Sequence, residues 1–133
     1  MSTDVKQYED KVATIAQEYY NSCDADSFYF TIWGGEDIHI GLYRGEDHPI
    51  YDASRETVKR MAAHLSGLDE SSRVLDVGAG YGGSARYLAS TYGCRVVALN
   101  ISEVENRRDR QKNREQGLDH LIDVVDGSFE DIP

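Results

Sequence analysis

The chain has 133 residues, of which 40% are hydrophobic, so it is long enough for one domain with its own core. Its formal net charge is −10, with 24 acidic against 14 basic side chains. That balance argues against nonspecific binding to nucleic acid, which needs a basic face, and against an anionic membrane surface. Cys23 and Cys94 lack metal-binding or redox spacing, and no apolar run approaches the roughly 20 residues that span a bilayer, so we expect a cytoplasmic protein.

The first third of the chain combines one helix with an aromatic-rich stretch. Apolar side chains at helical spacing predict an amphipathic helix over residues 4–21, and the turn formers of residues 21–26 predict a break after it. Residues 27–43 are dense in aromatic side chains and follow neither period, so we expect an ordered lid or loop. These aromatic residues either fasten a helical cap to the sheet or line a site for a cation, to which aromatic faces are attracted.

A second helix is predicted from residue 51 to residue 66. Asp52 or Ser54 is its expected N-cap, and Gly67 is expected to end it. Apolar residues at helical spacing predict a stripe that faces the core: Val58, Met61, Ala62 and Leu65.

The stretch from Arg73 to Gly83 gives the most specific indication of a function. A strand is predicted over residues 74–77, with Asp76 near its end, and a helix over residues 84–91. Between them lie four glycines, at positions 78, 80, 82 and 83. Glycine allows a sharp turn with unusual φ and lets the backbone come close to a ligand. The following helix N-terminus offers free N–H groups.

Two classes of ligand use such a loop. The dinucleotide fingerprint G-x-G-x-x-G is matched by Gly78, Gly80 and Gly83. The pattern D-x-G-x-G-x-G, which looks like the first motif of S-adenosylmethionine (SAM)-dependent methyltransferases, is matched through Asp76 and Gly82. The acid favours the second class, because a carboxylate would receive the ammonium group of SAM but repel a pyrophosphate.

The rest of the chain predicts two more strands around a third helix. The strand over residues 95–99 shows no alternation, which is typical of a strand covered on both faces. Ser102 and Glu105 form a capping box for a helix over residues 102–116, and a strand follows over 121–125. We therefore expect parallel β-α-β units.

Asn100 follows the second strand, at the position where a ribose-binding acid is usual. Its amide can still hydrogen-bond two hydroxyls, so we expect ribose contact there. The helix over 102–116 carries a basic run, but acids alternate with the bases. This pattern predicts a solvated, ion-paired face and no nucleic-acid site.

An open α/β sheet seldom ends at three strands, and a bare strand edge is an aggregation hazard. We therefore expect either that the chain is the N-terminal part of a longer protein or that it covers the edge of its third strand by self-association.

Four stretches closely resemble one family: residues 28–43, 74–88, 98–106 and 126–130. They are similar to sarcosine/dimethylglycine N-methyltransferases, SAM-dependent enzymes that make the osmolyte glycine betaine. The resemblance implies an α/β fold of the class I SAM-methyltransferase (Rossmann-like) type. Its parts would be an N-terminal helical and aromatic cap (1–66) and a SAM-binding region (67–133). It also implies S-adenosyl-L-methionine as cofactor, sarcosine and dimethylglycine as small-molecule partners, and a truncated chain that is inactive by itself.

The resemblance also implies site residues. On the acceptor side we expect Tyr29, Trp33 and His39, with Arg44 the nearest candidate to hold the carboxylate of the acceptor. The residues expected to contact the cofactor are Ile40, Gly41, Asp76, Gly78, Ala79, Gly80, Gly82, Asn100, Ile101, Ser128 and Phe129. No metal site is expected.

Three alternatives stay open at this point. The first is another small-molecule SAM methyltransferase, of the phosphoethanolamine type. The second is a dinucleotide-binding oxidoreductase, against which Asp76 is the main argument. The third is a non-catalytic module of the SAM fold that needs a second chain.

Overall fold

The computed structural model describes the backbone of residues 3–132 and the side chains of residues 10–132. The elements follow one another as α1 (Thr3–Asn21), α2 (Cys23–Ile32), α3 (Ile50–Ala62), β1 (Arg73–Val77), α4 (Gly83–Tyr92), β2 (Arg95–Asn100), α5 (Glu103–Glu115) and β3 (Ile122–Asp126). The predicted α1, α4, α5 and three strands are confirmed to within one or two residues.

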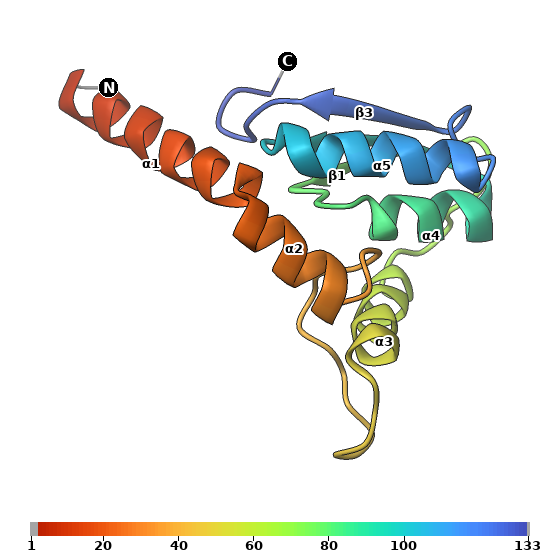
Figure 1. Ribbon diagram of the computed structural model, residues 1–133. Helices are drawn as coiled ribbons and strands as arrows, with labels where there is room; N and C mark the ends of the chain where they lie inside the picture. The colour runs from red at the N-terminus through yellow and green to blue at the C-terminus, as the bar shows by residue number, and fades with distance from the viewer. Residues whose placement is uncertain (1–2, 133) are drawn as a thin grey trace.

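The three strands form one parallel sheet in the order β1-β2-β3, as predicted. Asp76 is in register with Ala98, and Asn100 with Asp126. Both connecting helices, α4 and α5, lie on the same face of the sheet (Figure 1). The carboxyl ends of all three strands therefore meet at one edge of the sheet.

The core lies between this face of the sheet and α4. Its buried members are Ala62, Ala85, Leu88, Ala89, Cys94, Val96, Ala98 and Ile122. The opposite face carries apolar side chains that are 38–46% exposed: Leu75, Val77 and Val97. The prediction that the second strand is covered on both faces is therefore wrong for the described residues, because both crossover helices pack on the same side.

Helix α2 replaces the predicted break and the first part of the predicted loop. The Ser22 hydroxyl caps it by accepting the Ala25 N–H at 3.2 Å, and Asp24 and Asp26 lie in its first turn, where the helix dipole favours acids. Ser and Asp form turns and helix N-caps alike, so the same residues predicted the wrong element. Residues 33–43 are irregular, as expected.

Helix α3 is shorter than predicted. It begins at Ile50, after Pro49, without a side-chain cap, so neither expected N-cap is used. Ser54 lies inside the helix, where its hydroxyl donates to the His39 carbonyl at 2.9 Å. The helix ends at Ala62 instead of running to residue 66. Two members of the predicted core stripe lie near the surface: Met61 is 45% exposed and Leu65 is 48% exposed.

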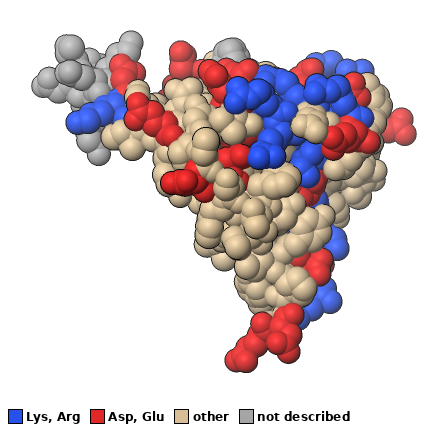
Figure 2. Space-filling model, viewed as in Figure 1, with Lys and Arg blue, Asp and Glu red and all other residues tan. Residues whose placement is uncertain are grey.

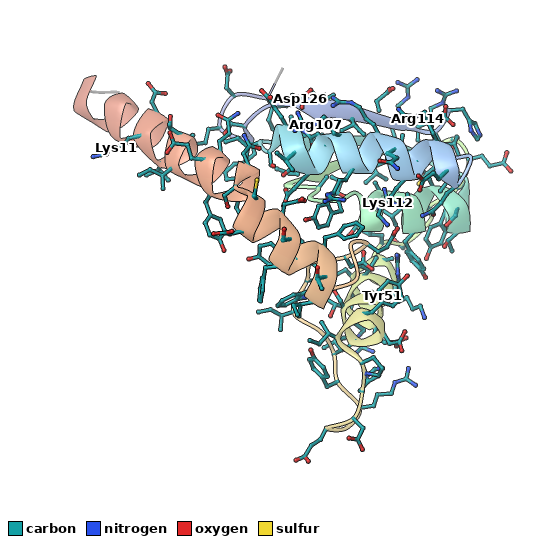
Figure 3. All side chains as sticks on the ribbon, in the orientation of Figure 1. Lys11, Tyr51, Arg107, Lys112, Arg114 and Asp126 are labelled. Atoms are coloured by element: carbon teal, nitrogen blue, oxygen red, sulfur yellow. The ribbon has the colours of Figure 1, made fainter. Side chains whose placement is uncertain are left out.

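Helix α5 carries the basic surface that Figure 2 shows in blue. Its Arg108, Arg110 and Lys112 form ion pairs, as predicted, although their partners are Asp26, Asp126 and Glu36 from other elements. In Figure 3, Lys112 lies on the side of α5 that faces α4, and Asp126 lies on the β3 side. The basic helix therefore holds several parts of the fold together.

Helix α2 follows α1 after a single residue, and α1 extends away from the sheet at its N-terminal end (Figure 1). The division into regions 1–66 and 67–133 stays a prediction, and its outer ends lie outside the described residues. No helix within residues 3–132 is long and apolar enough to cross a membrane.

Candidate functional site

A cavity of about 290 Å³ lies at the carboxyl ends of the strands. Six parts of the chain line it: α1, the segment after α2 at Ile38, the glycine-rich loop after β1, the end of β2, the first turn of α5 at Glu105, and the loop after β3. In parallel α/β sheets this edge is the usual place for a ligand.

Six of the expected cofactor residues come together in this cavity. They are Gly78, Gly80, Asn100, Ile101, Ser128 and Phe129. Their positions follow from the parallel register, because Asn100 is the last residue of β2 and the others lie within three residues after the end of a strand. That these residues bind a cofactor stays a proposal.

The four glycines of the loop serve two different purposes. Gly78 has a φ of +74°, and a Cβ there would meet nothing within 4 Å; Gly80 has a φ of +56° and faces Ile38 across the cavity wall. A Cβ on Gly82 would instead overlap the carboxylate of Asp109, and one on Gly83 would overlap that of Asp37. The first two glycines therefore open the loop to the cavity, and the last two make room for buried acids.

Gly82 thus lies away from the cavity lining, and so do four other residues that were expected at the cofactor: Ile40, Gly41, Ala79 and Asp76. Ile40 is 87% exposed, and Gly41 packs against Ala53 of α3. The backbone N–H of Ala79 donates to the Leu99 carbonyl at 3.1 Å, so this residue joins the loop to β2.

Asp76 is largely buried near the end of β1, and its Oδ2 has no hydrogen-bond partner within the described part of the chain. Burial raises the pKa of this carboxyl, and the nearby His39 opposes that effect. Asp76 and His39 line a second cavity of about 300 Å³ beside Ser84. A buried carboxylate oxygen without a donor is suited to receive an ammonium group from a ligand.

Asn100 is buried and already partly bonded. Its amide nitrogen donates to Glu105 Oε2 at 2.9 Å, and its carbonyl accepts from Asn106 at 2.9 Å. Its amide oxygen is not used in either bond. Only half of the predicted capping box forms, because Ser102 accepts the Glu105 N–H but the Glu105 side chain points to Asn100.

Glu105 is a cavity residue that the sequence analysis missed. It is buried, lines the cavity, and burial raises the pKa of its carboxyl. The signal was present in the sequence: a residue three positions after an N-cap lies in the first helical turn, beside the end of the preceding strand.

Helix α1 supplies a further wall that the sequence analysis missed. Val12, Ala13, Ala16 and Tyr20 line the cavity, whereas the side chains of Ile15 and Tyr19 are more than half exposed. No local pattern links α1 to a loop more than a hundred residues away.

The three expected acceptor-side residues separate into two places. Tyr29 stacks with Tyr20 at a ring distance of 6.3 Å and lies edge-on to Trp33 at 5.5 Å, so these two join a cluster that borders the cavity. His39 lies on the other side, where its Nε2 is 3.1 Å from Ser84 Oγ and its carbonyl accepts the Trp33 indole N–H at 3.0 Å.

The protonation of Tyr29 and the position of Arg44 limit the roles that these residues can have toward an acceptor. A hydrogen bond with Tyr19, and then burial, raise the pKa of Tyr29 to about 12, so Tyr29 keeps its proton at neutral pH. The Arg44 side chain is 76% exposed and pairs with Glu56 at 2.8 Å, outside both cavities. The described residues therefore bring no arginine clamp to the cavity lining.

Comparison with known proteins identifies the relatives. A family model described as mycolic acid cyclopropane synthetase matches residues 6–133. The chain is 64% identical over 127 residues to a sarcosine/dimethylglycine N-methyltransferase of Halorhodospira halochloris, covering 96% of this chain and 46% of the relative. It is 57% identical to a glycine/sarcosine/dimethylglycine N-methyltransferase of Actinopolyspora halophila, covering 97% of this chain and 22% of the relative.

Solved structures agree. A candidate sarcosine dimethylglycine methyltransferase from Galdieria sulphuraria is 43% identical, with a TM-score of 0.78 over 86% of this chain and 44% of that one. A geranyl diphosphate C-methyltransferase from Streptomyces coelicolor A3(2), solved with S-adenosyl-L-homocysteine, shares the fold at 17% identity and a TM-score of 0.76, covering 91% of this chain and 49% of that one.

The chain spans less than half the length of each of these relatives. The predicted resemblance to sarcosine/dimethylglycine N-methyltransferases and the predicted α/β fold are confirmed. Because the family model covers nearly the entire sequence, the chain belongs to the mycolic acid cyclopropane synthetase family and has the class I SAM-methyltransferase fold.

Proposed function

We propose that the chain is the SAM-binding part of an N-methyltransferase that methylates sarcosine and N,N-dimethylglycine toward glycine betaine. The observation that carries this proposal is the 64% identity, over 96% of the chain, with a relative of that name. The cavity at the carboxyl edge of the sheet supports it, because two glycines of the SAM motif, Gly78 and Gly80, line it together with Asn100.

In this proposal the cofactor lies along the cavity. Ser128 and Phe129 would contact its adenine, Asn100 and Glu105 its ribose hydroxyls, and the loop at Gly78 its methionine end. The unpartnered oxygen of Asp76 would accept its ammonium group. When bound, SAM supplies a methyl group on a sulfonium.

The work left to the protein is alignment and exclusion of water. The acceptor nitrogen must be unprotonated when it bonds to the methyl carbon, as the bond from that carbon to sulfur breaks. Dimethylglycine gives a quaternary product, so its ammonium proton must pass to solvent before the transfer, and none leaves during it. Tyr29, with its raised pKa, fits a hydrogen-bond donor or an aromatic face and does not fit a base.

The aromatic cluster is the proposed acceptor side. Tyr20 and Tyr29 are stacked, and Phe28 and Trp33 both lie edge-on to Tyr29. Aromatic faces attract sulfonium and methylated ammonium groups, by about 0.5–2 kcal/mol per good contact. His39, bonded to Ser84, is proposed to hold this segment in place.

The competing dinucleotide function is disfavoured by charge. Three carboxylates lie around the glycine-rich loop: Asp37, Asp76 and Asp109. Burial is the main cause that raises the pKa of each carboxyl, and repulsion from a neighbouring carboxylate adds to it, so a pyrophosphate would enter an already acidic environment.

We also propose self-association, but through a different surface from the predicted edge of β3. The edge of β3 was expected to be bare, but Arg110 donates to the Val124 carbonyl at 3.0 Å and pairs with Asp126 at 2.6 Å. Charged side chains protect a strand edge in this way. The apolar sheet face at Leu75 and Val97 is the better surface for a second chain. Location in the cytoplasm stays a prediction from composition.

The test combines binding with transfer. Calorimetry of the purified chain should show binding of S-adenosyl-L-homocysteine and none of NADH. Labelled methyl transfer from SAM should then be measured separately with glycine, sarcosine and dimethylglycine. The enzyme would be a chimera in which this chain replaces the matching part of the Halorhodospira halochloris relative. We expect transfer to sarcosine and dimethylglycine by the chimera, and none by the chain alone.

The possible failures are distinct. Binding of NADH without S-adenosyl-L-homocysteine would establish the dinucleotide function. A chimera that binds S-adenosyl-L-homocysteine but methylates neither amine would contradict the acceptor assignment and favour a non-catalytic module.

A further inference from the structure

Arg86 of α4 is the largest fully buried side chain of the described residues, with 2% of its surface exposed. Its Nε donates to Glu36 Oε1 at 2.6 Å, and its Nη2 donates to the Tyr81 carbonyl at 2.5 Å. Its Nη1 donates to Asp109 and Asn113 at 2.9 Å each. One guanidinium thus bonds to the irregular segment after α2, the glycine-rich loop and α5.

Two of these partners adjoin the walls of the cofactor cavity. Glu36 lies two residues before Ile38, and Tyr81 directly follows Gly80. Ile38 and Gly80 both line the cavity and face each other, since a Cβ on Gly80 would lie 3.2 Å from Ile38 Cδ1. Arg86 therefore holds, from behind, the two segments that meet at this wall.

The charges around Arg86 are balanced and come from several elements. Arg55 of α3 pairs with Asp37 at 3.0 Å and donates to the Gly83 carbonyl at 3.3 Å. Lys112 of α5 pairs with Glu36 at 3.2 Å. Displacing any charged member of this buried network would leave a buried charge without its partner, which is costly.

The segment that carries Ile38 depends on these bonds. Within the described part of the chain, residues 34–41 make no backbone-to-backbone hydrogen bonds. Side chains of Trp33 and Ser54 hold the carbonyl of His39. On the other side of Ile38, the polar attachment comes from Glu36 and its neighbour, through the buried network.

We propose that Arg86 is a positioning residue of the cofactor site, which acts through Glu36 and Tyr81 to hold Ile38 against Gly80. It touches no ligand itself. This inference rests on the proposed function, because it assumes that the cavity binds the adenosyl cofactor. A residue that only stabilised the fold would change the melting temperature and leave the affinity of the folded protein unchanged.

The test compares two Arg→Lys variants by calorimetry with S-adenosyl-L-homocysteine, well below their melting temperatures. Arg86→Lys keeps the charge but cannot reach Glu36 and Tyr81 together, and we expect at least a tenfold loss of affinity. Arg108→Lys is the matched control. Arg108 forms a two-pronged ion pair with Asp26 between α5 and α2. We expect a lower melting temperature and an affinity within about twofold of wild type.

A double-mutant cycle tests the route. If Arg86 acts through Ile38, then Arg86→Lys should weaken binding much less in an Ile38→Ala background than in the wild type. If Arg86→Lys does not fold, Glu36→Gln is tested in its place. Glutamine keeps one hydrogen-bond acceptor for the guanidinium but removes the charge. We expect this variant to lose affinity for S-adenosyl-L-homocysteine by about threefold or more.

The results that would overturn the positioning role of Arg86 differ from those that would overturn the proposed function. Wild-type affinity in folded Arg86→Lys, or in folded Glu36→Gln if that variant is used, overturns the inference and leaves the proposed function intact. Equal losses in Arg86→Lys and Arg108→Lys also overturn it, because the effect would then be general loosening. Absence of binding by the wild type overturns both proposals.

Discussion

Replacing Gly82 with alanine should destabilise the protein far more than the same change at Gly78. Both residues have positive φ, +78° and +74°, so both variants bear the left-handed strain of a residue with a Cβ, about 1–2 kcal/mol. At Gly78 nothing else lies within 4 Å. At Gly82 even the farther carboxylate oxygen of Asp109 would be only 2.5 Å from the new Cβ, so the carboxylate must leave its 2.9 Å bond to Arg86.

A buried charge that loses its partner costs about 3–5 kcal/mol, so Gly82→Ala should cost about 4–7 kcal/mol in total. Small domains have about 5–15 kcal/mol of stability, so this variant lies close to unfolding. Urea denaturation measures both costs, and calorimetry with S-adenosyl-L-homocysteine should show that folded Gly78→Ala binds more weakly. Adding Asp109→Ala to Gly82→Ala should cost less than the sum of the single changes. A Gly82→Ala variant no less stable than Gly78→Ala would refute the reasoning.

Asp76→Asn should weaken S-adenosyl-L-homocysteine binding by about 1.5–3 kcal/mol through loss of an ammonium contact, yet leave stability equal or higher, because burial already raises the pKa of this carboxyl. Normal affinity with lowered stability in calorimetry and melting would show that Asp76 only braces the loop. Asn100→Asp should be less stable at pH 8 than at pH 5, because it places a second buried carboxylate at the 2.9 Å contact with Glu105; equal melting temperatures at both pH values would contradict this. Burial raises the pKa of Asp109 to about 6, so the native state binds its proton more tightly than the unfolded state between pH 3.8 and about 6, and stability falls as pH rises through that range. Relative to Asp109→Asn, the wild type should lose up to about 3 kcal/mol of unfolding free energy between pH 4 and pH 7 in urea titrations, and a constant difference would count against the shift.

Local patterns predicted the parts of the fold that depend on neighbours in sequence. The strands and α5 were found because their apolar runs, caps and glycines lie within a few residues of one another. Helix α2 was missed because Ser22 and Asp24 favour a turn and a helix start equally, and its docking decides between them. Arg108 and Tyr81 provide that docking through Asp26, 55 or more positions away in sequence.

The residues of the site likewise divide into those that local sequence predicts and those that depend on packing. Gly78, Asn100 and Ser128 were predicted at one place because each follows a parallel strand, and strand direction alone brings them together. The wall from α1 and the carboxylate of Glu105 were not predicted, since they depend on how helices pack around the cavity. The purpose of Gly82 could not be derived either, because Asp109 lies 27 positions further along the chain.

The seating of Asp109 and Asp37 against the last two glycines has a consequence for how this motif varies among homologues. A side chain at position 82 requires that position 109 lose its carboxylate, whereas one at position 83 would also overlap the backbone carbonyl of Glu36. Substitutions at 82 and 109 should therefore occur together, whatever the cofactor is. At Gly78 a Cβ would meet no neighbouring residue, so beyond its positive φ only the ligand restricts that position. A motif search that counts four equivalent glycines thus combines two independent selective pressures, and paired substitution at 82 with 109 would mark a homologue whose helices have repacked while its cofactor has not changed.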